Sequence, residues 1–179
     1  VILFTNIPEN ERVATVDDKT DSKIGPMSFR HFMLGAVAIF IYVGVEVGIP
    51  NVLQKWLQNG GLEGANAESI AATVAATYWL LMFFGRLAGA ALGAKLSAKT
   101  MLTSVSLLGL LLVAGAMILD PANTINLPVF KGTEGFGLAE VPVNAALLVL
   151  CGLCTSVMWG GIFNLAVEGL GKYTEKASG

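Results

Sequence analysis

Charged residues are scarce in this sequence of 179 residues. Asp, Glu, Lys and Arg make up 13% of the chain, against about 25% in an ordinary soluble domain. The formal net charge is −2, so no basic surface is available to neutralise a run of phosphates, and we expect no nucleic-acid partner. Because 54% of the residues are hydrophobic and the mean hydropathy is +0.68, the composition predicts a membrane protein.

Groups that would support catalysis or hold a metal ion are also few. Cys151 and Cys154 lie inside an apolar stretch with no histidine or second cysteine pair nearby, so we expect them to be small packing residues. The sequence contains no recognisable pairing of a nucleophile with a base and no phosphate-binding loop. We therefore expect no enzymatic activity, no metal and no cofactor.

Four apolar segments are long enough to cross a bilayer, which takes about 20 residues in a helix because each residue rises about 1.5 Å. They cover residues 32–53, 70–94, 100–119 and 142–167. Each must be helical in hydrocarbon, where unpaired backbone groups have no water to bind. The sequence therefore predicts an all-α membrane protein with four transmembrane helices.

The remaining segments are polar or rich in glycine and proline. Residues 1–30 mix acidic and basic side chains and are predicted to be a solvated linker, so that the membrane part covers 31–179. The connections over 58–67 and 120–141 contain three glycines each, and the second also has two prolines, so both are predicted to be loops. The chain starts at Val1, without a methionine, and we expect it to be a piece of something longer.

Lysine and arginine are distributed unevenly over the predicted connections. Three precede the first helix, two lie in the short second connection and two follow the fourth helix: Lys19, Lys23, Arg30, Lys95, Lys99, Lys172 and Lys176. The other two connections hold one each. Because positive residues accumulate on the cytoplasmic side, we expect both ends of this chain to be cytoplasmic.

Glu46 lies inside the first predicted helix, where a carboxylate costs on the order of 3 kcal/mol unless it faces a partner or a watery cavity. Pro50 cannot donate a hydrogen bond to the Glu46 carbonyl and tends to kink the helix. Tyr42 and Asn51 add polar groups on either side, so this stretch is a candidate site for a polar ligand. The alternative is that Pro50 only allows packing and that Glu46 is neutral and bonded to another helix.

The second predicted helix carries Gly85, Gly89 and Gly93 at intervals of four. Such a surface allows another helix backbone to approach closely, and it permits rocking as well as static packing. Arg86 lies toward the cytoplasmic end of this helix. Its long side chain either reaches the lipid headgroups or pairs with an acidic residue of another helix.

The fourth predicted helix carries a stripe of small and polar residues at intervals of four. They are Gly152, Ser156, Gly160, Asn164 and Glu168. Trp159 lies beside this stripe near the middle of the helix, and the following Gly160 weakens the helix there. A tryptophan ring offers a flat apolar surface to the C–H face of a sugar, so Trp159 is a candidate binding residue, with core packing as the alternative.

Three stretches of the sequence resemble a known transporter family. They are residues 40–53 (FIYVGVEVGIPNVL), 84–102 (FGRLAGAALGAKLSAKTML) and 156–179 (SVMWGGIFNLAVEGLGKYTEKASG). They are similar to the seventh, the eighth-to-ninth and the tenth helix regions of the fucose and glucose/galactose permeases of the major facilitator superfamily. The resemblance implies that these four helices belong to the six-helix carboxyl-terminal half of a transporter, whose first six and last two helices would be the partners of this chain.

Members of this family are proton-coupled sugar symporters that work by alternating access. The resemblance therefore implies transport of a monosaccharide with H⁺ as the coupling ion, and it assigns the coupling groups to the amino-terminal half. It implies that the sugar cavity is lined by Tyr42, Glu46, Asn51, Trp159 and Asn164. We expect roles in packing and conformational change for Pro50, Gly85, Arg86, Gly89 and Gly160. Gly160 stands where members of the family often have proline.

A second hypothesis is a small accessory or structural membrane protein that forms oligomers through its glycine surfaces. Coding sequence for two further apolar segments after Gly179 would favour the permease, and a stop codon there would favour the accessory protein.

Overall fold

The structure, a computed structural model, describes residues 25–62, 64–93, 95–174 and 177. Its four long helices are α1 (Arg30–Trp56), α2 (Ala67–Gly93), α3 (Ala98–Ile118) and α4 (Val143–Val167). All four are long and apolar enough to cross a membrane. The predicted four-helix membrane fold is therefore confirmed, whereas most of the predicted linker over residues 1–30 lies outside the described residues.

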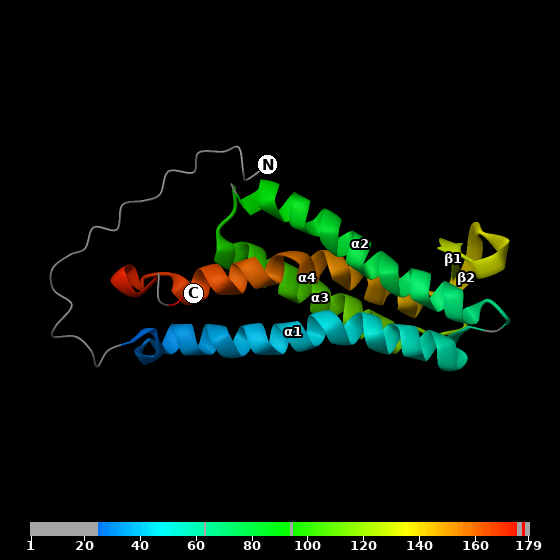
Figure 1. The fold of residues 1–179 in the computed structure, drawn as a ribbon, viewed down its shortest axis with the longest axis horizontal. Helices are drawn as coiled ribbons and strands as arrows, with labels where there is room; N and C mark the ends of the chain where they lie inside the picture. The colour runs from blue at the N-terminus through cyan, green and yellow to red at the C-terminus, as the bar shows by residue number, and fades with distance from the viewer. Residues whose placement is uncertain (1–24, 63, 94, 175–176, 178–179) are drawn as a thin grey trace.

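Helix α4 lies at the centre of the arrangement and packs against each of the other three helices (Figure 1). Helices α1 and α2 lie on either side of α4 and contact each other much less. They are close together where α1 ends and α2 begins, and they separate toward the C-terminal end of α4 (Figure 1). The bundle is thus tight at one end and splayed at the other.

Glycines allow α2 to approach α4 closely. A Cβ atom at Gly152 would lie 2.5 Å from the Tyr78 carbonyl oxygen, and one at Gly85 would collide with the Ser156 side chain. A Cβ atom at Gly89 would likewise collide with a side chain of α4. Because helices in lipid associate mainly through van der Waals packing, this close approach is a principal source of stability for the pair.

Helices α3 and α4 pack through small residues and one amide. Cys151 and Cys154 are free and buried, as expected of packing residues. The Nδ2 atom of Asn144 donates to the carbonyl oxygens of Ala116 and Leu119 at 2.7 and 2.9 Å. Since the last carbonyls of a helix have no partner within it, Asn144 satisfies two groups at the end of α3 and fixes the start of α4 against them.

The prediction of a loop over residues 120–141 is wrong. The segment forms an antiparallel hairpin of β1 (Thr124–Phe130) and β2 (Phe136–Pro142), in which Ile125 pairs with Val141. Alternate residues of the hairpin, among them Val129 and Val141, are buried. This alternation is the normal signal of a strand, and the glycines and prolines of the segment obscured it.

The hairpin covers the tight end of the bundle. One apolar cluster there combines residues of α1, α2, α4 and both strands, and it includes Leu53, Leu57, Ile70, Val74, Val129, Val141 and Val149. Burial of so many large side chains in one cluster holds α1 and α2 together at this end. The splayed end has no such cluster among the described residues.

Helix α1 is longer than the sequence predicted. It continues through the buried Pro50 to Trp56, and Leu57–Gly61 add one wider helical turn. Gly60, with a φ angle of 151°, ends this turn in a conformation that favours glycine. The predicted loop over 58–67 therefore begins too early. Gly60 lies where the helical turn ends, and the residues just before it are still helical.

Gly152→Ala is expected to destabilise the bundle, because the new methyl group would meet the Tyr78 backbone carbonyl, which cannot rotate away. We expect a loss of about 1–3 kcal/mol, as for other overpacked sites, measured as a lower thermal unfolding midpoint of the purified protein in detergent. Gly109→Ala is the matched control, because its methyl group would lie 3.5 Å from the Cβ atom of Cys154, an ordinary contact. Equal stability of the two variants would contradict the close approach of α2 and α4.

Candidate functional site

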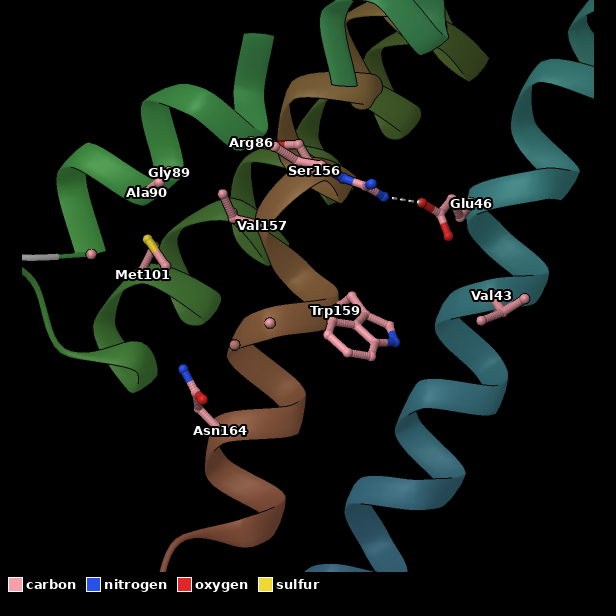
Figure 2. Close-up of a pocket in the computed structure, with 13 residues that line it drawn as sticks. Val43, Glu46, Arg86, Gly89, Ala90, Met101, Ser156, Val157, Trp159 and Asn164 are labelled. Carbon is pink, nitrogen blue, oxygen red and sulfur yellow. Dashed lines mark hydrogen bonds and ion pairs between the residues drawn. The ribbon is translucent and has the colours of Figure 1, made fainter. Parts of the chain in front are cut away.

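A cavity of about 660 Å³ lies between α1, α2 and α4 at the splayed end of the bundle, and Met101 of α3 also lines it (Figure 2). This volume is within the range of about 300–1,000 Å³ that is usual for small-molecule sites. The lining residues are Val43, Glu46, Arg86, Gly89, Ala90, Gly93, Met101, Ser156, Val157, Trp159, Gly160, Gly161 and Asn164. The cavity therefore combines one ion pair, one aromatic ring and one amide with small and apolar residues.

The stripe of small residues on α4 explains why the cavity forms where it does. Gly152 is in close contact with α2, Ser156 both contacts α2 and borders the cavity, and Gly160 and Asn164 follow on the same stripe and line the cavity. A Cβ atom at Gly160 would meet no other atom within 4 Å, and the same holds for Gly93 on α2. Small residues thus bring the helices together along one part of their length and leave open space along the next.

Glu46 and Arg86 form an ion pair between α1 and α2. The Nη2 atom of Arg86 donates to Oε1 of Glu46 at 3.2 Å (Figure 2). The Glu46 side chain is 14% exposed and that of Arg86 is 56% exposed. In apolar surroundings a paired charge is much less costly than an isolated one. Of the two alternatives for Arg86, the structure shows the contact with an acidic residue of another helix.

Trp159 and Asn164 face the cavity from α4. The indole ring projects into the space between α4 and α1, and the residue is 48% exposed (Figure 2). Asn164 lies further along the same helix, and its amide offers both a donor and an acceptor. Of the two alternatives for Trp159, exposure on the cavity wall is what the structure shows, and not burial in a core.

Tyr42 and Asn51 lie outside the cavity. The buried Tyr42 hydroxyl donates to the carbonyl oxygen of Thr155 at 3.0 Å. The exposed Asn51 donates through Nδ2 to the carbonyl oxygen of Val47, 2.7 Å away within the same helix. The predicted binding residues that the structure brings together around the cavity are therefore Glu46, Trp159 and Asn164.

A buried polar junction that the sequence analysis missed lies in the interior of the bundle. Thr155 of α4 accepts the hydrogen bond from Tyr42 of α1, and its Oγ1 atom lies 2.9 Å from the hydroxyl oxygen of Tyr78 of α2. All three side chains are buried. The junction ties α1 and α2 to α4 through one residue, and helical spacing alone could not show which tyrosine would meet Thr155.

A second feature that the sequence analysis missed is the ring of Phe163, which stacks on Trp159. The two residues are four positions apart, a spacing that places side chains next to each other on a helix surface. That spacing was a signal that could have identified the pair.

The chain is 28% identical over 161 residues to the glucose/galactose transporter of Brucella abortus biovar 1 (strain 9-941), a match that covers 89% of the chain. It is 31% identical over 152 residues to a candidate glucose/galactose transporter of Helicobacter pylori (strain J99), covering 85% of the chain. The chain is similar to bacterial glucose/galactose transporters.

These matches cover 34% and 32% of the two relatives, so the chain spans about a third of their length. No family model matches the chain, and no solved structure matches it. The resemblance to glucose/galactose permeases that the sequence motifs indicated is thus supported by curated relatives. The assignment to the wider fucose-permease family, and to one half of a transporter, stays a prediction.

The two single variants that each remove one charge of the Glu46–Arg86 pair are expected to lose, in sum, more free energy of unfolding than the variant that removes both charges. Glu46→Gln leaves Arg86 unpaired and Arg86→Gln leaves Glu46 unpaired, whereas the double variant removes both charges. Because Arg86 is half exposed, we expect a coupling energy of only about 0.5–1 kcal/mol. Thermal unfolding of the four proteins in detergent measures it, and strictly additive losses would show that the pair does not form.

Proposed function

We propose that this chain is part of a sugar transporter of the glucose/galactose type and that its cavity supplies one wall of the sugar site. The observation that carries the proposal is the gathering of Glu46, Trp159 and Asn164, from two membrane-length helices, around one cavity. The substrate class comes from the relatives, which are named for glucose and galactose.

The three side chains offer both kinds of contact that a hexose needs. The indole of Trp159 presents an apolar surface to the C–H face of the ring. Asn164 donates to and accepts from hydroxyl groups, and Glu46 accepts from them. A carboxylate has acceptor sites on both oxygens, so the contact of Arg86 with Oε1 leaves Glu46 able to bind a hydroxyl as well.

The proposal places the four helices at the start of the carboxyl-terminal half of a major facilitator superfamily transporter. The missing six helices before them and two after them would complete the sugar site. Every lining residue of α2 and α4 belongs to the second half of its helix, the half that the distribution of Lys and Arg assigns to the cytoplasmic side of a bacterial inner membrane. The splayed bundle would therefore correspond to an inward-facing state of alternating access.

Proton coupling is part of the proposal, and the sequence resemblance assigns the coupling groups to the missing amino-terminal half. Glu46 is accordingly proposed as a sugar ligand held by Arg86, and not as the proton carrier. With the roles divided in this way, changes to the cavity should alter the affinity for the sugar, and uptake should still be driven by the proton gradient.

Trp159→Ala in the complete transporter is expected to raise the KM for D-galactose uptake about tenfold, because the sugar loses an aromatic surface. Uptake of labelled D-galactose and D-glucose into proteoliposomes measures this, with rates normalised to the amount of inserted protein. Trp79→Ala is the matched control, since Trp79 is also exposed but lies outside the cavity. Unchanged KM values in both Trp159→Ala and Asn164→Ala would exclude the cavity from the sugar site.

Glu46→Gln is expected to weaken sugar binding while leaving uptake coupled to the proton gradient. A neutral amide accepts hydroxyl hydrogen bonds less strongly than a carboxylate, so the KM should rise about tenfold. Accumulation of the sugar against its gradient should persist at saturating concentration and collapse with an uncoupler. Loss of accumulation with retained sugar exchange would instead identify Glu46 as the proton carrier and contradict this assignment.

A further inference from the structure

Phe163 contacts the ring of Trp159 from outside the cavity. Both residues belong to α4, with ring centroids 5.3 Å apart and ring planes 2° from parallel. Phe163 is partly buried and does not line the cavity, whereas Trp159 does. The two rings thus form a stack in which only one member borders the space for a ligand.

Trp159 is only partly packed against the rest of the bundle. Nearly half of Trp159 is exposed, and its ring lies between α4 and α1 (Figure 2). A tryptophan side chain has two rotatable bonds, and the exposed half of the residue leaves the ring room to change rotamer. The stack with Phe163 is the ring contact that restricts it within the described residues.

We propose that Phe163 is a positioning residue that holds the indole of Trp159 at a fixed orientation toward the sugar. The proposal rests on the proposed function, because it assumes that the indole receives the sugar ring. If the indole occupied several orientations, only a fraction of the transporters would be competent to bind, and the apparent affinity would fall by that fraction. Phe163 lies outside the cavity, so its effect on the sugar passes through Trp159.

A purely structural role for Phe163 would have a different consequence. Packing that stabilises α4 in general would be lost to the same extent whether or not Trp159 is present. Positioning, in contrast, has nothing to act on once the indole has been removed. A double-mutant cycle on sugar affinity therefore separates the two roles.

The experiment compares Phe163→Leu in the wild-type and Trp159→Leu backgrounds of the complete transporter. In the wild-type background we expect the KM for D-galactose uptake, and the Kd from calorimetric titration, to rise about two- to tenfold. The maximal rate per inserted protein should change less than the KM. Phe163→Tyr retains the ring and should keep the wild-type KM. In the Trp159→Leu background, Phe163→Leu should cause no further loss.

Two results would overturn the proposal. One is an unchanged KM in Phe163→Leu, and the other is a rise by the same factor in both backgrounds. Phe84→Leu is the matched control, because Phe84 contacts another ring on α2, is exposed and lies outside the cavity, so its KM should stay at the wild-type value. If Phe163→Leu does not reach the membrane, Phe163→Met is tested in its place, because methionine is similar in volume to leucine and also lacks a ring.

Failure of the proposed function would look different. In that case the wild-type transporter would take up neither hexose, or Trp159→Leu alone would leave the KM unchanged. Either outcome removes the sugar from Trp159 and overturns the role of Phe163 with it. An additive cycle, in contrast, overturns only the role of Phe163 and leaves the sugar site in place.

Discussion

Close packing of α2 on α4 sets the positions of the side chains that reach from α2 toward α1 and toward the interior of the bundle. Because Gly152 has no side chain, the backbone of α2 at Tyr78 reaches van der Waals contact with α4. Apolar helices gain no hydrophobic free energy by leaving lipid for each other, so such contacts decide how they associate. The same approach brings the Tyr78 hydroxyl to Thr155 and sets the position from which Arg86 extends to α1.

The contact between α2 and α4 continues differently in its two directions, and this explains why one end of the bundle is tight and the other is splayed. Toward the hairpin, large apolar side chains of α1, α2 and both strands fill the space and hold the helices together. In the other direction the glycines continue, at Gly93 and Gly160, but they no longer meet a partner. A row of small residues therefore gives a helix contact where the axes converge and a cavity where they diverge. The β-hairpin contributes by closing one end, so that separation is confined to the other.

Two of the three cavity-facing groups that the proposed function uses, Glu46 and Trp159, are each held by a neighbour. Arg86 holds the carboxylate of Glu46, and Phe163 stacks on the indole of Trp159. Both arrangements restrict a side chain before any ligand arrives, which reduces the ordering cost of binding. In one pair the holding residue lies on another helix, and in the other it lies one turn away on the same helix. The pairs therefore respond differently to helix movement, since rocking of α1 would break the first and leave the second intact.

The membrane class, the four helices and three of the cavity residues, Glu46, Trp159 and Asn164, could be predicted from the amino-acid sequence. Hydrocarbon forces long apolar segments into helices, and it makes residues such as Glu46 costly enough to mark a site. Tertiary packing places Tyr42 and Asn51 outside the cavity and brings Glu46 to Arg86, whereas the hairpin over residues 124–142 had a local signal that its glycines and prolines obscured. Helical spacing tells which side chains share a face, but the rotation and tilt of each helix depend on where another backbone can approach it. The place of closest approach depends on shape complementarity between helices that are distant in the chain, and a local sequence pattern does not show it.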